Sequence, residues 1–91
     1  MKLNAEGVDV TGADTYTSIF RTEQSCSRLR VTLDAGYDAL LSLNGGQTAH
    51  MRIPANSYMV LDGLAIPALT ELLGKNAVAG QNYTNLRVQA W

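Results

Sequence analysis

The sequence contains one cysteine and one histidine in 91 residues. A single thiol cannot form an internal disulfide, which excludes a small secreted scaffold held together by disulfides. Nucleophilic catalysis needs a histidine beside a hydroxyl or thiol and an orienting carboxylate, whereas the neighbours of His50 are Ala49 and Met51. Cys26 lies near Arg28, which could activate its thiol, but a lone thiol in a polar segment is usually inert, and we favour that interpretation. These absences favour a protein without an active site.

Charge of one sign and long apolar runs are also lacking. Seven Lys and Arg residues oppose eight Asp and Glu residues, which leaves no basic stripe to release counterions from a phosphate backbone. No apolar run approaches the roughly 20 residues of a membrane-spanning helix, and Lys2 is not followed by an apolar signal core. We therefore expect a protein that binds neither nucleic acid nor membrane and is not exported by the usual route.

The sequence is instead rich in apolar residues placed on alternate positions. Leu29, Val31 and Leu33 alternate with Arg30 and Thr32, the period of a half-buried strand, because successive side chains leave a pleated backbone on opposite faces. The same period, or a β-branched and aromatic composition, predicts further strands. The predicted strands cover residues 16–21, 29–33, 39–43, 48–53, 57–61, 70–78 and 85–91.

Turn residues separate the central strands. Residues 34–38 contain a glycine between two aspartates, and Asn44–Gly46 is the strongest short hairpin signal in the chain. Pro54 stops the following strand because it has no N–H for the ladder. We read four strands joined by three hairpin-like connections, which predicts a meander or part of a Greek key.

Residues 64–78 allow two interpretations. Ile66, Leu69 and Leu72 fit one face of a short helix, with Gly74 as its cap. The alternative is a strand over 70–78, and we favour it because the strand at 85–91 needs an antiparallel neighbour. The intervening residues 79–83 have the length of a hairpin loop.

The amino-terminal residues 1–15 show neither clear period. They are interpreted as an extended arm, with a first strand around Val8 and Val10 as the alternative. Residues 16–91 form a single domain. The predicted fold is an all-β antiparallel sandwich, or a jelly-roll-like one, of about six to eight strands. A domain of this size often gains burial from a partner subunit, so we expect a homo-oligomer.

Two sets of residues could in principle carry a ligand. Asp34 and Asp38 flank a turn, but a calcium loop needs several more oxygen ligands at regular intervals, and turn chemistry accounts for both. Four aromatic residues could form a sugar-binding platform or an interface belt, but because they are scattered over different strands and loops we favour separate roles as core and contact residues. These are Tyr37, Tyr58, Tyr83 and Trp91. No catalytic, metal or cofactor site is predicted.

Several segments together resemble a known class of protein. Asp38–Gly46 (DALLSLNGG), Val60–Leu64 (VLDGL) and Gly74–Val88 (GKNAVAGQNYTNLRV) are similar to the small β-sandwich virion proteins of tailed bacteriophages and prophages. The resemblance covers residues 29–91 and includes no catalytic signature. It implies a viral structural protein that is assembled in the host cytoplasm and resides in the virion, with the major capsid protein or other virion subunits as partners.

The function expected from this resemblance is capsid decoration: a cement protein that stabilises the head lattice through many copies of one interface. A head–tail connector, a tail or fibre accessory subunit, and a small carbohydrate-binding module are the alternatives. An enzyme is the least favoured. The arm would clamp a neighbouring subunit, and the candidate interface residues are Tyr16, Phe20, Arg21, Tyr83 and Trp91.

Overall fold

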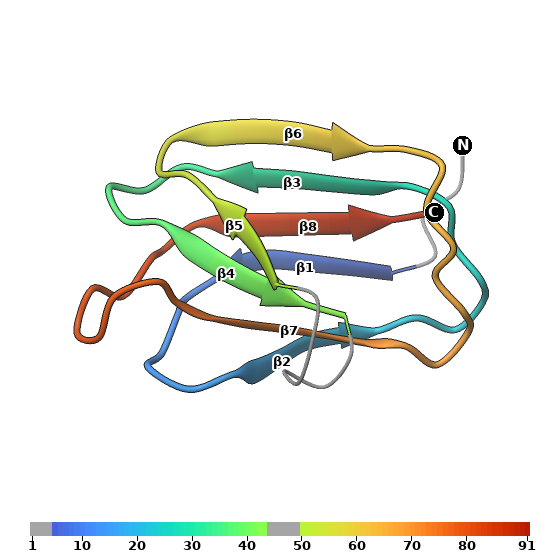
Figure 1. Ribbon diagram of the computed structural model, residues 1–91, viewed down its shortest axis with the longest axis horizontal. Coiled ribbons are helices and arrows are strands. Elements are labelled where there is room, and N and C mark those ends of the chain that lie inside the picture. The colour runs from blue at the N-terminus through green and yellow to red at the C-terminus, as the bar shows by residue number, and fades with distance from the viewer. Residues whose placement is uncertain (1–4, 44–49) are drawn as a thin grey trace.

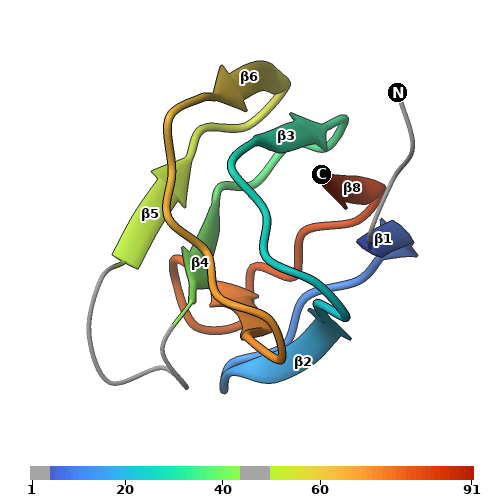
Figure 2. The same cartoon turned by 90° about the vertical axis from the view of Figure 1, so that its right-hand side faces the viewer.

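Two antiparallel four-stranded sheets pack face to face as a β-sandwich (Figures 1 and 2). The computed structural model describes residues 5–43 and 50–91. One sheet has the order β1-β8-β3-β6 and the other β2-β7-β4-β5, which confirms the predicted all-β sandwich. The strands are β1 (Ala5–Val10), β2 (Thr17–Arg21), β3 (Leu29–Leu33), β4 (Ala39–Ser42), β5 (His50–Ile53), β6 (Ser57–Leu61), β7 (Glu71–Asn76) and β8 (Leu86–Ala90).

The apolar alternation of residues 29–33 becomes the inner face of β3, whereas in β6 the alternating Tyr58 and Val60 lie on the outer face. In β3, Leu29, Val31 and Leu33 are at most 1% exposed, whereas the intervening Arg30 is exposed. Fully burying a side chain of this kind stabilises the fold by roughly 1.5–3 kcal/mol. Further members of the core are Ala39, Leu41, Ile53, Ile66, Leu72, Tyr83, Leu86, Val88 and Ala90.

The connections between strands differ from those expected. Residues 34–38 and 54–56 do not close hairpins, because β3 and β4 lie in different sheets, as do β5 and β6. Only β4 and β5 pair as an expected hairpin would, and the Asn44–Gly46 turn lies outside the described residues. The meander is therefore wrong. A short polar connection can cross the roughly 10 Å between sheets as readily as it can turn back within one.

The pairing follows a single rule from the middle of the chain outward. β4 pairs with β5, β3 with β6, β2 with β7 and β1 with β8, all antiparallel. Because these pairs alternate between the sheets, the structure is one long ribbon of strand pairs wrapped around the core.

The strand interpretation of residues 70–78 is confirmed by β7. The predicted pairing of this strand with the last one is wrong, because β7 pairs with β2 and β4 whereas β8 pairs with β1 and β3. Residues 77–85 pass from one sheet to the other. The loop length was suitable for a hairpin, but each strand buries its apolar face by pairing with strands distant in the sequence.

The amino-terminal segment contains a strand. Ala5–Val10 forms β1 and pairs with β8 at the edge of its sheet. This confirms the alternative interpretation, a first strand around Val8 and Val10. The pairing is interrupted between Gly7 and Val10, where Asp9 has a φ of 54°. Residues 1–4 of the expected arm lie outside the described part of the chain.

Candidate functional site

A groove lies at one end of the sandwich, between two connections. The β2–β3 and β6–β7 connections run antiparallel there, because Cys26 and Ile66 exchange two backbone hydrogen bonds with N–O distances of 2.8 and 3.0 Å. The carbonyl of Trp91, which directly follows β8, accepts hydrogen bonds from the amides of Ser27 and Arg28, each at 3.0 Å. Backbone pairing therefore builds the walls of this groove.

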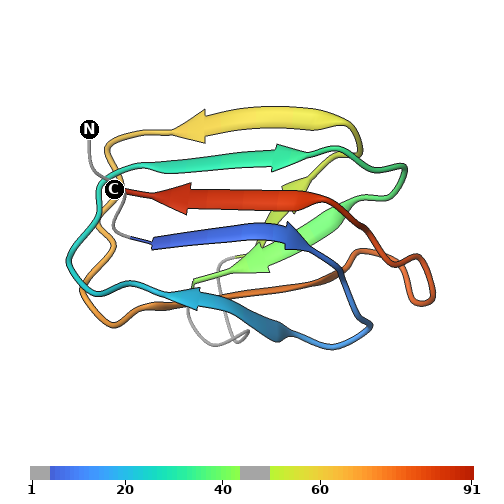
Figure 3. The same ribbon diagram turned by 180° about the vertical axis from the view of Figure 1, so that it is seen from behind.

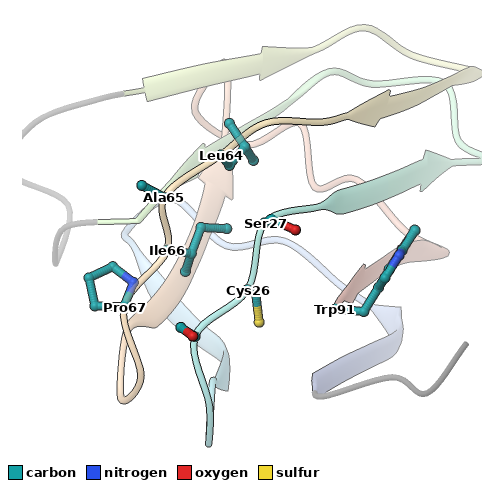
Figure 4. Close-up of a pocket in the computed structure, with 8 residues that line it drawn as sticks. Cys26, Ser27, Leu64, Ala65, Ile66, Pro67 and Trp91 are labelled. Carbon is teal, nitrogen blue, oxygen red and sulfur yellow. The ribbon is translucent and has the colours of Figure 1, made fainter.

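The groove has a volume of about 450 Å³ and is mainly apolar. Figure 4 shows Leu64 to Pro67 on one side of Cys26 and Trp91 on the other. The thiol of Cys26 is the one titratable group among the lining residues, and it is buried. The indole Nε1 of Trp91 is buried without a hydrogen-bond partner in the described part of the chain. This groove can accept an apolar group, and apart from the thiol of Cys26 its lining side chains offer no acid, base or set of metal ligands.

The second candidate surface is the outer face of the sheet β1-β8-β3-β6, which Figure 3 shows from behind the molecule. Its side chains form two rows across the strands, because opposed residues in an antiparallel sheet share a face. One row consists of Glu6, Gln89, Arg30 and Val60, and the other of Asp9, Arg87, Thr32 and Tyr58.

The two acidic and two basic side chains in these rows sum to zero charge, and each of the four has a polar or aromatic contact. Gln89 donates a hydrogen bond to Glu6 at 3.1 Å, and the Nε of Arg87 lies 3.4 Å from a carboxylate oxygen of Asp9. The guanidinium of Arg30 lies 5.1 Å from the centre of the Tyr58 ring, a cation–π contact. The outer face therefore presents no net charge of either sign, and its β6 end is apolar, with Tyr58 58% and Val60 46% exposed.

The structure separates the five predicted interface residues into three locations. Phe20 and Arg21 belong to β2, and Tyr16 directly precedes it. The ring of Tyr16 lies 5.1 Å from the Lys75 ammonium, and burial raises the pKa of its phenol. Arg21 forms an exposed ion pair with Glu71 at 3.1 Å. These two residues remain accessible, but both already contact β7.

The other predicted residues lie in different surroundings. Phe20 is half-buried against the core, and Trp91 lines the groove. Tyr83 is fully buried and belongs to the core, so it is not an accessible interface residue of this chain. The hydroxyl of Tyr83 has no hydrogen-bond partner in the described residues, and burial raises the pKa of this phenol.

The aromatic residues do not gather into one platform. Tyr37 and Tyr58 are exposed, whereas Tyr83 is buried and Trp91 half-buried. A sugar-binding platform made of all four, one of the alternatives left open by the sequence, is therefore not formed in this fold.

At the end of the sandwich opposite the groove, two aspartate side chains form hydrogen bonds that link neighbouring connections. Asp38 accepts a hydrogen bond from the Ala55 amide at 2.7 Å and pairs with Arg52 at 2.8 Å, and both contacts lower the pKa of its carboxyl. Asp14 accepts hydrogen bonds from the Gly80 amide and the Asn76 side chain, at 2.8 and 2.9 Å, which lower its pKa. These carboxylates hold neighbouring connections together.

Metal-ligand and membrane-spanning features were also sought. Within residues 5–43 and 50–91, no group of three or more His, Cys, Asp or Glu residues could hold a metal ion. No helix long and apolar enough to cross a membrane occurs in the same residues. His50 opens β5, and its side chain lies outside the described part of the structure.

Sequence reasoning did not single out the exposed end of the outer face. Tyr58 and Val60 were read as the apolar positions of a half-buried strand, whereas the structure exposes both side chains. The alternation Ser57–Leu61 places both side chains on one face, which was a usable signal. That β6 is an edge strand depends on the order of strands in the sheet, which the local pattern does not contain.

Comparisons with family models, curated proteins and solved structures gave no match to this chain.

Proposed function

We propose that this chain is a non-enzymatic structural subunit of a tailed-phage virion that decorates the head and stabilises its lattice. The observation that carries the proposal is the strand pairing, β1 with β8 through β4 with β5 in alternate sheets. We read this order as that of a jelly roll, an architecture common among viral capsid proteins and also found in lectins and cupins. The resemblance of residues 29–91 to phage virion proteins points to the first of these groups.

The chemistry of the surface supports a binding role. The lining of the groove holds no set of groups for acid–base or metal chemistry, and the acidic and basic side chains in the rows of the outer face are equal in number. Such surfaces suit protein contacts in which shape and apolar area contribute more than charge. A decoration subunit needs only modest affinity at each contact, because repetition around a symmetric shell supplies avidity.

The composition of purified particles provides the first test. Virions are induced from the strain that encodes this chain, purified on a density gradient and analysed by quantitative mass spectrometry. The proposal predicts that the chain co-purifies with the major capsid protein at a constant, high ratio across gradient fractions. An abundant host cytoplasmic protein serves as the control for contamination. Absence of the chain from the particles would overturn the proposal.

Copy number and location distinguish the position in the particle. A head-decoration role predicts hundreds of copies and additional density on the shell by electron cryomicroscopy. A single ring of copies, with density at the neck or tail, would instead identify a connector or tail subunit. Binding of the isolated protein to a glycan array, without incorporation into particles, would identify a carbohydrate-binding module.

A further inference from the structure

The four edge strands of the sandwich differ in how well they are protected against pairing with another strand. The ladder of β1 with β8 is interrupted between Gly7 and Val10, and the ladder of β2 with β7 between Ser18 and Phe20. Irregularities and charges of this kind are how natural sheets block edge-to-edge association. β5 is only four residues long and carries the exposed Arg52.

β6 has none of these features. Its register with β3 is unbroken over Ser57–Leu61, and the segment contains no charge, proline or glycine. Its outward residues Tyr58 and Val60 are among the exposed large apolar side chains of the described chain. A regular, uncharged edge with exposed apolar residues is a template for a further strand.

The core is also less covered at β6 than elsewhere. Leu29 and Val31 in β3 are fully buried, whereas their partners Leu61 and Met59 in β6 remain partly exposed. Figure 2 shows β6 at the upper margin of its sheet, away from the corner where β1 and β2 approach each other. An added strand would therefore cover apolar area on both faces of this edge.

We propose that β6 pairs antiparallel with β6 of a second copy of this chain, joining two four-stranded sheets into one continuous eight-stranded sheet. In the symmetric register that overlaps all of Ser57–Leu61, the two-fold axis passes through Met59, the middle residue of the strand. This register sets Tyr58 of each copy opposite Val60 of the other.

A second copy is the occupant favoured by the charges. In this register uncharged residues face uncharged residues along the whole strand, and beyond its end Asp62 faces Asn56 of the other copy. No like charges are opposed, so self-pairing meets no electrostatic penalty. The pair is isologous, the interface type of most soluble dimers. This inference does not depend on the chain being a virion protein.

The test uses the double variant Tyr58→Glu/Val60→Glu. In the proposed register each new carboxylate faces a carboxylate of the other copy, which disfavours the pair. Within one copy both carboxylates lie next to Arg30, which opposes Val60 and contacts Tyr58, so the fold is kept. Circular dichroism verifies the fold. Val8→Glu, which changes an exposed residue on the protected edge of the same sheet, is the matched control.

Sedimentation equilibrium measures the mass up to about 1 mM, which includes weak specific association. We expect the unmodified chain and the Val8→Glu variant to reach twice the 9.8 kDa of one chain. The double Glu variant should dissociate at least about tenfold more readily, a change of about 1.4 kcal/mol. A monomeric unmodified chain, or an unchanged dimer of the folded double Glu variant, would overturn the proposal.

A charge-swapped partner tests the register itself and remains decisive if one variant is unstable alone. The variant Tyr58→Lys/Val60→Lys is mixed with the double Glu variant, so that each ammonium group faces a carboxylate. Association of the mixture with a mass of two chains, detected by native mass spectrometry, is the expected result. Failure of the two variants to associate, while the unmodified chain is dimeric, would refute the Met59-centred register.

Discussion

The two long sides of the sandwich are built differently. On the side of β1 and β2 the sheets approach so closely that a Cβ at Gly7 would collide with the Cγ2 of Ile19, and both edge ladders are irregular. On the side of β6 the ladder is regular, and the inward residues are only partly covered. The first side is closed by the chain itself, whereas the second is left available to another molecule.

This difference separates stability from association. Inward-facing residues on the closed side, such as Gly7, have little room for change, because protein interiors are packed as densely as organic crystals. Outward residues of β6 contact little of their own chain, so changing them costs the fold little and alters what the edge can bind. Substitutions on the two sides should therefore be read by different measurements.

The largest effect is expected for Gly7→Ala on the closed side. The new methyl group collides with Ile19 and approaches Phe20, and such overpacking typically costs about 1–3 kcal/mol. Urea denaturation measures this loss. Gly36→Ala is the matched control, because no atom lies within 4 Å of its Cβ position, and we expect it to leave stability unchanged or slightly raised. Equal losses in both variants would remove the proposed contrast.

Tyr83→Phe should increase stability. The Tyr83 hydroxyl is buried and has no partner among the described residues, and a buried unsatisfied polar group costs roughly 1–3 kcal/mol. We expect a gain of about 1 kcal/mol in the free energy of unfolding, measured by urea denaturation. Tyr37→Phe, at an exposed ring, is the control and should be neutral. A loss of stability in Tyr83→Phe would mean that the hydroxyl has a partner and would refute this account.

Lowering the pH should reduce the stability that three aspartate side chains contribute through their hydrogen bonds. The pKa values of Asp14, Asp38 and Asp62 are lowered by hydrogen bonds to their carboxylates. Because folding lowers these pKa values, the carboxylates stabilise the fold above the unfolded value of 3.8, and this contribution is lost as the pH falls below it. Thermal unfolding measured from pH 6 to pH 2 should show decreasing stability.

Two substitutions compare the contributions of Asp14 and Asp38 to stability. Asp14→Ala and Asp38→Ala should each flatten the acid dependence, since each removes one carboxylate whose protonation disfavours the fold. At neutral pH, Asp14→Ala should lower the free energy of unfolding more than Asp38→Ala does. The reason is that Asp14 binds the side-chain amide of the buried Asn76, whereas Asp38 binds the exposed Arg52. An acid dependence identical to that of the unmodified chain in both variants would contradict the assignment.

The smallest effect is expected for Arg30→Ala on the outer face. Its contact with Tyr58 is exposed, and an exposed cation–π contact contributes about 0.5–1 kcal/mol. We expect a loss of stability of no more than this amount in urea denaturation. Arg30→Lys, which keeps the positive charge, is the control and should lose less. A loss of several kcal/mol would show that the open side is as sensitive to substitution as the closed side.

Local sequence was sufficient to identify β2 to β8, whereas β1 lies in the segment that was interpreted as an extended arm. The predicted bounds 29–33 and 57–61 coincide with β3 and β6, and the interpretation of 70–78 as a strand rather than a helix is confirmed by β7. Side chains alternate between faces with a period of two in any extended backbone, so the pattern carries this information wherever the strand is placed.

The same pattern could not predict the pairing or the positions of the candidate residues. Residues 79–83 had the length of a hairpin loop, yet β7 and β8 lie in different sheets. Tyr83 was a candidate interface residue, but its side chain is fully buried. The β7–β8 connection, which carries Tyr83, packs against the β1–β2 connection, where the amide of Gly12 donates a hydrogen bond to the carbonyl of Tyr83 at 2.8 Å. No local signal distinguishes a buried tyrosine in a loop from an exposed one.

By itself, the amino-acid sequence determined most of the extended segments and, in a strand such as β3, which side chains point to the core. The tertiary structure alone decided that β1 pairs with β8, that β3 and β8 are central, and that β6 is an open edge. The physical reason is that closing a longer loop costs only about 0.6 kcal/mol for each doubling of its length. Near and distant partners therefore compete on almost equal terms, and the choice is made by how completely the whole set of strands buries its apolar faces.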